Sequence, residues 1–305
     1  MVGNAYAVGS VRNFKSQWSS YLRFCITNKL QIFPPVTDNV VRFYTHLTQK
    51  LSAYSSLQNY QSAIAMFYRI YGYECDTSSV LIKFLNMSAK KSLNTAPATK
   101  KPLEINHIIH MLKIADLQNP FHLCFMSAIT LGFFGLLRRS NICPPSPGQF
   151  DATKHLRRQD VTLDQNGLII KLQWSKTNQH KQSVFEIPIA YSGSKEMDPP
   201  SLFNAFCTQC PVLPGDPCFS FYHHGHHYIL THKDLSDMLS DFLRAIGVNS
   251  EGITTHSIRK GGTCLLHRAG IMIPALKEHG TWTSEAYKSY LHYNMSDKLN
   301  VTQSV

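Results

Sequence analysis

Four residues near the end of the chain have side chains and a spacing that suit chemistry on a phosphate ester. His256 and Arg259 lie three residues apart in T-H-S-I-R-K-G-G, so they project from one face of a predicted helix. Trp282 and Tyr290 follow in W-T-S-E-A-Y-K-S-Y. Arginine offers a planar fork of donors that matches phosphate, histidine transfers protons near neutral pH, indole donates a hydrogen bond, and a phenol is a nucleophile.

Three helices are predicted to position these residues. Thr255 is a candidate N-cap of the first helix, and Thr283 or Ser284 is a candidate N-cap of the third. Pro274 suits the first turn of the second helix, and Gly280 is expected to end it. On this prediction Trp282 lies at the start of the last helix, and Tyr290 lies two turns further along it.

The pattern H-S-x-R-x-G-G followed by W-x-S-x-A-Y-x-x-Y resembles the C-terminal motif of the tyrosine recombinases, the phage-integrase-like enzymes of DNA strand exchange. With Trp282 where many phage integrases have His, it is most similar to recombinases of DIRS-like and Crypton-like mobile elements. The spacing from tryptophan to tyrosine in that form selects Tyr290 as the nucleophile. On composition alone Tyr287 or Tyr293 could serve, and His279 is the rival to Trp282 as a donor to phosphate.

The resemblance implies an arginine upstream, and the block G-L-L-R-R-S-N-I supplies it. Residues 104–117 and 120–138 are predicted helices, and the family places its functional arginine directly after such an apolar helix, which selects Arg138. Arg139 is instead interpreted as an arginine that stabilises the dipole at a helix C-terminus. The family usually has an acid where this chain has Asn141, which leaves open how Arg138 is held.

The resemblance also implies a catalytic lysine in a β-hairpin. Strand-like patterns occur at three places, residues 161–163, 168–174 and 184–189, and predict a three-stranded antiparallel sheet. The loop between the last two strands contains S-K-T, which matches the family's lysine position. Lys176 is therefore the candidate, ahead of Lys181 and Lys171, although a lysine on a hairpin is ordinarily a solubilising residue.

The mechanism that the resemblance implies uses no metal and no other cofactor. Tyr290 would form a covalent 3′-phosphotyrosine, and because that bond conserves energy, no ATP is required. Arg138 and Arg259 would surround the non-bridging oxygens of the phosphate, and His256 would take part in proton transfer. Lys176 would donate a proton to the leaving 5′ oxygen.

Positive charge is concentrated in the N-terminal third of the chain. The net charge is +11, and residues 1–95 carry ten Lys or Arg against three Asp or Glu, which is +7. Such a balance suits a polyanion, with a merely solvated basic surface as the alternative. The resemblance makes the partner double-stranded DNA, bound by a homo-oligomer that forms a tetramer on paired sites.

The predicted architecture is mainly α-helical with a small antiparallel sheet, an α+β chain of two domains. Residues 1–95 contain four amphipathic segments and are expected to form an N-terminal helical, core-DNA-binding domain. Their aromatic stripes are interpreted as core, and the fourth apolar stripe contains Val80, Leu81, Phe84 and Leu85. Residues 96–103, A-P-A-T-K-K-P-L, are a predicted linker whose Lys100 and Lys101 could lie along a phosphate backbone. Residues 104–305 are the predicted catalytic domain.

The cysteines and the hydropathy indicate a cell interior. Eight cysteines without a disulfide framework suit reduced thiols, and no apolar run is long enough to predict a membrane span. Cys207 and Cys210 with Cys218 and the nearby histidines could bind zinc, although reduced loop cysteines and surface histidines are the simpler interpretation. The mobile-element resemblance implies a nuclear location in a eukaryote and a cytoplasmic one otherwise.

Two functions from different classes are compatible with these patterns. The first is an active recombinase that cleaves and rejoins DNA strands for the integration or excision of a mobile element. The alternative is a catalytically inactive DNA-binding protein derived from such a recombinase. A topoisomerase that uses the same phosphotyrosine chemistry is a third, weaker possibility.

Overall fold

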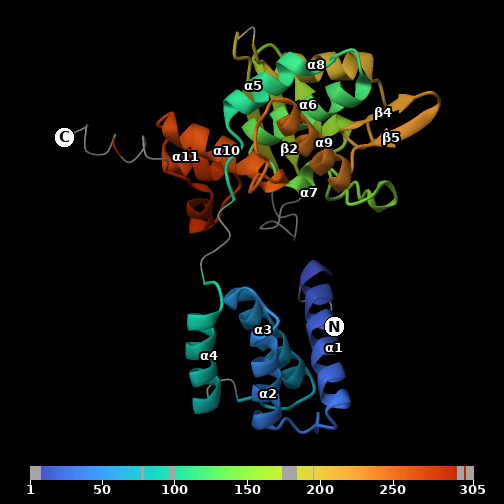
Figure 1. Cartoon of the computed structure of the whole chain (residues 1–305). Helices are drawn as coiled ribbons and strands as arrows, with labels where there is room; N and C mark the ends of the chain where they lie inside the picture. The colour runs from blue at the N-terminus through green and yellow to red at the C-terminus, as the bar shows by residue number, and fades with distance from the viewer. Residues whose placement is uncertain are drawn as a thin grey trace. The chain divides into compact units, whose positions relative to one another are not determined.

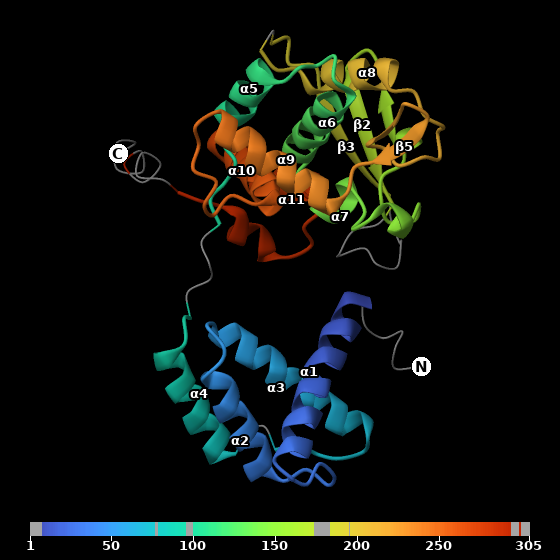
Figure 2. The same ribbon diagram turned by 45° about the vertical axis from the view of Figure 1, so that its right-hand side comes forward.

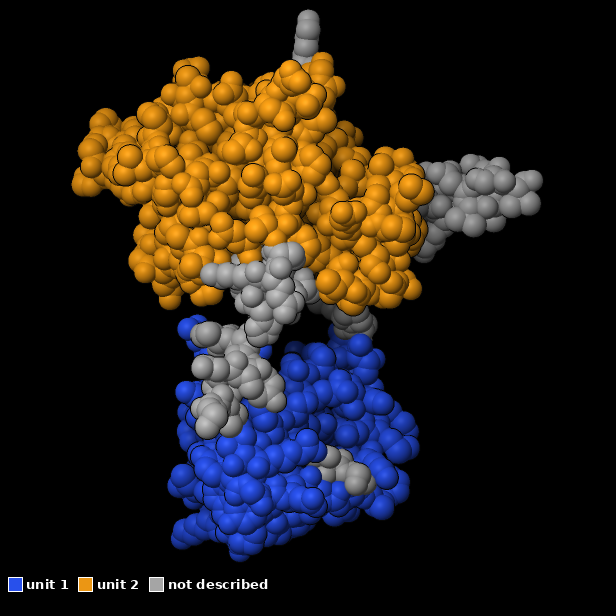
Figure 3. Space-filling model, turned by 180° about the vertical axis from the view of Figure 1, so that it is seen from behind, with its two compact units in different colours: residues 1–99 blue, residues 100–305 orange. Residues whose placement is uncertain are grey.

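The computed structural model describes residues 8–76, 79–95, 100–173, 184–194, 196–293 and 299 of the chain. The chain divides into two compact units, residues 1–99 and residues 100–305, which are coloured separately in Figure 3. Helices predominate, and a three-stranded antiparallel sheet lies in the second unit. The predicted fold class, mainly α with a small antiparallel sheet, is confirmed.

The first unit is built from four helices, which are α1 (Val8–Thr27), α2 (Thr37–Thr48), α3 (Tyr54–Ile70) and α4 (Val80–Ser92) (Figure 1). Its core is rich in buried aromatic side chains: Trp18, Tyr21, Phe43, Tyr44 and Tyr68. The Tyr68 hydroxyl donates to the carbonyl oxygen of Ile32 at 2.9 Å, so the 2.8 Å bond between the Tyr21 and Tyr68 hydroxyls has Tyr21 as donor. The interpretation of the aromatic stripes as core is confirmed for Trp18, Tyr21 and Tyr44 but is wrong for Tyr71 and Phe84, which are 56% and 63% exposed.

The fourth helix presents a different face from the one predicted. Val80, Leu81 and Phe84 are 63%, 53% and 63% exposed, whereas Ile82 and Ala89 are 2% and 1% exposed. The predicted apolar stripe was therefore wrong at three of its positions. The buried positions are seven residues apart, as on one side of a helix, and the small Ala89 side chain allows close packing there.

The helices of the second unit are α5 (Ile105–Ile114), α6 (Pro120–Phe134), α7 (Arg139–Ile142), α8 (Pro199–Gln209), α9 (His232–Ala245), α10 (Thr255–Arg268) and α11 (Ile273–His279), followed by the 3₁₀ helix η4 (Glu285–Tyr290) (Figure 2). Every residue of α6 from 123 to 133 is buried. A helix that is apolar on all sides is covered on all sides, so α6 forms the centre of this unit.

The sheet of the second unit has the order β1-β2-β3 and consists of β1 (Val161–Leu163), β2 (Gly167–Leu172) and β3 (Phe185–Ala190). Leu168 of β2 lies opposite Leu163 of β1 and Ile189 of β3. The Asp164 carboxylate closes the first turn by accepting from the backbone N–H of Asn166 at 2.7 Å. The three predicted strands are confirmed, and Lys176 and Lys181, between β2 and β3, lie outside the described residues.

A second, two-stranded sheet was not predicted. Strands β4 (Ser220–His223) and β5 (His226–Ile229) pair as an antiparallel hairpin. Its turn residues His224 and Gly225 have φ values of 49° and 78°, as a tight hairpin turn of two residues requires. The clustered histidines therefore belong to a hairpin and not to an irregular loop.

Two consecutive glycines allow α10 to approach its neighbours closely. A Cβ atom on Gly261 would lie 1.8 Å from the carbonyl oxygen of Leu103, and one on Gly262 would lie 1.9 Å from that of Phe133. Any larger residue would push α10 away from α6. The R-K-G-G sequence thus fixes the distance between Arg259 and the end of α6.

No helix within the described part of the chain combines the length and the apolar character that crossing a bilayer requires.

Candidate active site

An open pocket of about 590 Å³ in the second unit brings together residues far apart in the sequence. Four of the six predicted site residues line it: Arg138, His256, Arg259 and Tyr290. Trp282 packs next to this group without lining the pocket. Lys176, the remaining predicted residue, lies outside the described residues.

Arg138 reaches the pocket because the chain breaks between α6 and α7. The predicted helix 120–138 ends at Phe134, and Leu136 adopts a φ of 48°, so the chain reverses before Arg138. Arg138 then adopts an extended conformation directly before α7, and its backbone N–H donates to the Asn141 side-chain oxygen at 3.2 Å. Asn141, where the family usually has an acid, therefore fixes the Arg138 backbone through a neutral side chain.

The hydrogen-bond donors of the Arg138 side chain are only partly paired. Its Nη1 atom is buried and has no hydrogen-bond partner among the described residues. Burial lowers the pKa of Arg138, and the neighbouring Tyr290 phenol opposes that shift. Arg139 is exposed, also lines the pocket and begins α7. Its interpretation as an arginine at a helix C-terminus is therefore wrong.

The N-terminus of α10 is capped one residue earlier than predicted. The Thr254 hydroxyl, not that of Thr255, accepts from the backbone N–H of His256 at 3.3 Å. In return, the Thr254 N–H donates to the Ser257 hydroxyl at 2.9 Å. These bonds fix the first turn of α10, which carries His256, and Arg259 follows one turn later.

Arg259 is the most firmly held cation of the pocket. It is 2% exposed, and its guanidinium donates to the carbonyl oxygens of Leu136 and, at 2.6 Å, Gly280. Its Nε atom is buried and has no partner among the described residues. Burial and the positive charge of Arg138 lower the pKa of Arg259 to about 9, so the side chain stays protonated at neutral pH.

The indole ring of Trp282 packs against the guanidinium group of Arg259. The Arg259 guanidinium carbon lies 4.1 Å from the centre of the Trp282 ring, a cation–π contact, and Trp282 is 5% exposed. The indole Nε1 is buried without a hydrogen-bond partner among the described residues. Gly280 must lack a side chain because its Cβ would lie 1.8 Å from this ring. The rival His279 is placed elsewhere, with its Nε2 2.7 Å from the carbonyl oxygen of Phe134.

Tyr290 lies at the end of η4, a 3₁₀ helix and not the α-helix that was expected. Its ring centre is 4.9 Å from that of His256, 5.2 Å from that of Trp282 and 5.2 Å from the Arg259 guanidinium carbon. The thiol of Cys264 in α10 donates to the Tyr290 carbonyl oxygen at 3.3 Å. Packing and this bond together fix Tyr290 against α10.

The other two tyrosines of this segment lie away from the pocket lining. Tyr287 is 6% exposed and packs in a small apolar cluster with Leu136 and Leu276. Tyr293 is 50% exposed, and its hydroxyl is 3.0 Å from Nε2 of His267. Of the three tyrosines, Tyr290 is the one that lines the pocket.

His256 is held in its neutral form, which is the form that can accept a proton. Partial burial lowers its pKa, and nearby cations lower it further, with Lys100 first among them and the two pocket arginines also contributing. The imidazole is therefore neutral at neutral pH, beside the phenol of Tyr290. No carboxylate occurs among the described residues that line the pocket.

Sequence reasoning assigned no site role to some residues that line the pocket. Lys100 was predicted only as a linker lysine that could lie along a phosphate backbone, and His232, the first residue of α9, was not considered. Burial and the charge of Arg139 lower the pKa of His232 to about 4. Its position directly after the capping Thr231 was the only available signal. Lys171, a weaker candidate for the catalytic lysine, forms a surface ion pair with Glu186 at 3.4 Å.

The cysteine and histidine cluster does not assemble as a metal site within the described residues, where no three His, Cys, Asp or Glu side chains converge. Cys207 lies in α8 and Cys210 directly follows it, so these are not loop cysteines. Burial raises the pKa of both thiols and raises that of Cys218 further. Burial therefore disfavours the thiolate form that zinc requires.

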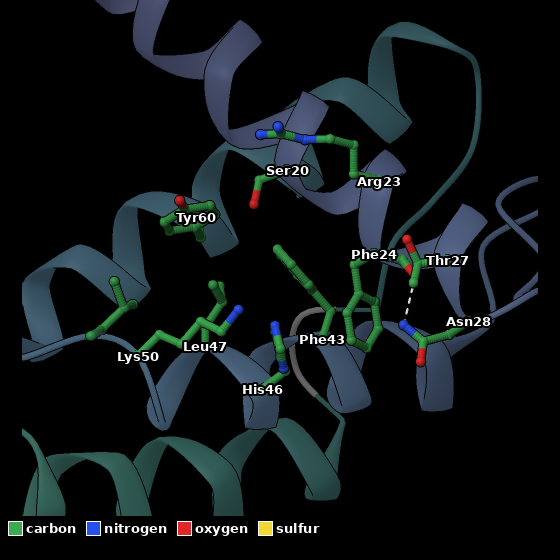
Figure 4. Close-up of a pocket in the computed structure, with 11 residues that line it drawn as sticks. Ser20, Arg23, Phe24, Thr27, Asn28, Phe43, His46, Leu47, Lys50 and Tyr60 are labelled. Atoms are coloured by element: carbon green, nitrogen blue, oxygen red, sulfur yellow. Dashed lines mark hydrogen bonds between the residues drawn. The ribbon is translucent and has the colours of Figure 1, made fainter.

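A second cavity, of about 470 Å³, lies within the first unit between α1, α2 and α3 (Figure 4). The rings of Phe24 and Phe43 line it with centres 5.2 Å apart. Arg23, His46 and Lys50 also line it. Arg23 and Lys50 are exposed and form no ion pair within the described part of the chain.

No protein-family model and no curated protein sequence matches the chain. Solved structures do match. The XerH site-specific recombinase bound to palindromic difH substrate has a TM-score of 0.65 at 14% identity, covering 99% of this chain and 81% of that chain. A lambda integrase dimer bound to a COC′ core site has a TM-score of 0.61 at 13% identity, covering 94% of this chain and 89% of that chain. The Tn1549 transposon integrase in complex with transposon right end DNA has a TM-score of 0.59 at 15% identity, covering 96% of this chain and 93% of that chain. The chain therefore has the fold of the tyrosine recombinases and integrases.

Proposed function

We propose that the chain is a site-specific DNA recombinase that cleaves and rejoins strands through a 3′-phosphotyrosine on Tyr290. The observation that carries this proposal is the convergence of Tyr290 with His256, Arg138 and Arg259 in one pocket. The likeness in fold to recombinases whose solved structures contain DNA supports it.

Unsatisfied donors in and beside the pocket favour an anionic substrate. Nη1 of Arg138, Nε of Arg259 and Nε1 of Trp282 are buried and lack partners among the described residues. Leaving a buried donor unpaired costs about 1–3 kcal/mol, so a ligand with several acceptor oxygens would be stabilised here. A phosphodiester has two non-bridging oxygens with negative charge, which match the two guanidinium groups.

The proposed reaction forms one bond and breaks another at the same phosphorus. The Tyr290 oxygen attacks the phosphorus, and the bond to the 5′ oxygen of the next nucleotide breaks. The phenol proton passes to the neutral imidazole of His256, and Arg138 and Arg259 stabilise the charge on the non-bridging oxygens. Lys176 gives a proton to the leaving 5′ oxygen. Attack by a 5′ hydroxyl reverses these steps and rejoins a strand.

The first unit is proposed to contribute DNA affinity. Residues 1–95 carry +7 of the net charge, and Arg23 and Lys50 lie exposed beside the cavity of Figure 4. These cations can contact phosphates without taking part in the chemical step. We further propose a tetramer on paired sites and a role in the movement of a DIRS-like or Crypton-like element, which rests on the W-x-S-x-A-Y-x-x-Y pattern.

The test uses a nicked duplex whose cleavage releases a short strand, so that the covalent protein–DNA adduct accumulates. The wild-type chain should form an adduct that resists denaturation, and Tyr290→Phe should form none while binding DNA as tightly as the wild type. Tyr287→Phe and Tyr293→Phe are matched controls, and Tyr293→Phe should retain the adduct. An adduct that survives Tyr290→Phe would refute the assignment.

The alternative function has a distinct outcome in the same assay. A DNA-binding protein that has lost catalysis would bind the recombination site and form no adduct with any sequence or nick position. The neutral Asn141, at the position of the family's usual acid, is the feature that favours this alternative. Asn141→Asp should then be tested for the appearance of an adduct.

A further inference from the structure

The first described residues of the second unit are fixed against the start of α10. The backbone N–H of Leu103 donates to the carbonyl oxygen of Ser257 at 2.9 Å. The ammonium group of Lys260, a side chain 6% exposed, donates to the carbonyl oxygen of Lys100 at 2.6 Å. Lys260 is in α10, so both bonds connect segment 100–103 to the helix that carries His256. The backbone of Lys100 is thus held at a defined place beside the pocket.

The side chain of Lys100 is exposed and lines the same pocket as His256 and Tyr290. The groups that act on the charge of His256 or pack against its ring are Lys100, Arg138, Arg259, Lys260 and Tyr290. Arg139 of α7 and His232 of α9 also line the pocket. Arg138 and Arg259 are already assigned another role, because in the proposed function they bind the non-bridging oxygens of the phosphate. Lys260 is bonded to a carbonyl oxygen. Lys100 is therefore the cation of this group with no other assigned contact among the described residues.

We propose that Lys100 is a positioning residue of the active site that acts through its charge on the imidazole of His256. The proposal rests on the proposed function, in which His256 accepts the proton of the Tyr290 phenol. The physical basis is that a nearby positive charge disfavours the protonated imidazole and so preserves the proton-accepting form.

The need for such a charge arises when substrate binds. A phosphodiester brings negative charge into the pocket, and that charge alone would favour the protonated form of His256. The substrate also neutralises part of the effect of Arg138 and Arg259 on the imidazole. Lys100, on a separate segment of the same pocket lining, adds a further positive charge that offsets part of the substrate's negative charge at His256.

The sign of the expected pH dependence follows from the direction of the shift. The pKa of His256 is lowered, first by partial burial and then by Lys100 ahead of the other cations. His256 accepts a proton only above its pKa, so a lower pKa extends the active range toward acid. Removal of the Lys100 charge raises that pKa, and activity is then lost first on the acidic side.

The direct test is an NMR titration of ring-labelled histidine in the full-length chain. The His256 signal is identified by its loss in His256→Gln. Lys100→Met should raise the pKa of His256, Lys100→Arg should restore the wild-type value, and Lys101→Met should leave it unchanged. Lys101 is a matched control because it is the adjacent exposed lysine, lies along Gly252 and does not line the pocket.

The same variants give a second readout in the adduct assay. The rate deficit of Lys100→Met relative to the wild type should be larger at about pH 5.5 than at about pH 8, and Lys100→Arg should remove the difference. An unchanged His256 pKa in Lys100→Met, or an equal shift in Lys101→Met, would overturn the proposal. The titration measures the pKa of His256 and requires no cleavage. It can therefore fail or succeed independently of the adduct assay, which tests the proposed function.

Discussion

Both units of the molecule carry excess positive charge, but they hold it in different ways. In the first unit Arg23 and Lys50 are exposed at the cavity of Figure 4 and form no ion pair with any described residue. In the second unit Arg259 is buried and bonded to two carbonyl oxygens, with Trp282 stacked behind it. Exposed surface cations attract a polyanion without placing any single phosphate, whereas buried and bonded cations can stabilise charge at one phosphorus atom. The difference predicts that changes in the first unit alter DNA affinity and changes at the pocket alter rate.

Among substitutions that leave the nucleophile in place, the largest loss of cleavage rate is expected for Lys176. A 5′ alkoxide is a poor leaving group, so Lys176→Ala should slow cleavage by about 10²–10⁴-fold if that lysine is the proton donor. On DNA whose bridging 5′ oxygen is replaced by sulfur, the leaving thiolate needs no proton and the variant should recover most of its rate. Equal slowing on both substrates would exclude Lys176, and Lys181 would be tested next.

Removal of a fixed arginine should give the next largest effect. Arg138→Ala should lower the cleavage rate by about 10²–10³-fold, because it removes donors aimed at the non-bridging oxygens. The sulfur substrate should not rescue it. Arg259→Lys serves as a second variant, because Lys keeps the charge but loses the planar fork that holds the Leu136 and Gly280 carbonyls. Rescue of Arg138→Ala by the sulfur substrate would contradict its assigned role.

A smaller effect, on binding alone, is expected in the first unit. Arg23→Ala combined with Lys50→Ala should reduce the slope of log affinity against log salt by about 2, because each substitution leaves one DNA phosphate without its cation. The cleavage rate at saturating DNA should be unchanged. Arg42→Ala is the matched control, because Arg42 is paired with Asp38 at 2.9 Å. If the cleavage rate at saturating DNA changed while the slope of log affinity against log salt did not, the first unit would act on rate and not on affinity, which would contradict the distinction between the units.

The smallest expected effect is that of a chelator. Two arginines supply the positive charge at the phosphorus, so the cleavage rate in EDTA, without nucleotide, should equal the rate in Mg²⁺. The comparison is made on the nicked substrate at one ionic strength, so that counterion effects on binding cancel. A chemical step that stops in EDTA would show that the arginines are insufficient.

Sequence patterns predicted the elements with strong periodicity or clear capping residues. The three strands of the first sheet and the helix that begins after Thr231 were predicted from alternation and from the T-x-x-D pattern. The end of α6 was predicted too late. Apolar residues continue through Leu137, and this run outweighed the stop signal of Gly135, which is the C-cap of α6 and precedes the φ of 48° at Leu136.

Other differences have separate physical causes. The exposure of Phe84 depends on how α4 rotates against its neighbours, which propensity does not determine. The second hairpin was missed because the run of histidines around Gly225 suggested a metal site, although a glycine between two aromatic-rich segments is itself a turn signal. Lys100 joined the candidate site only through long-range contacts with α10, which no local pattern encodes.

The most direct test of the central claim is identification of the residue that becomes covalently bound to DNA. The adduct from the nicked substrate would be digested with nuclease and protease, and the peptide that carries the nucleotide would be sequenced by mass spectrometry. A 3′-phosphate on Tyr290, with Tyr287 and Tyr293 unmodified, is the predicted result. A nucleotide on either of those two tyrosines, or on any residue outside the pocket, would contradict it.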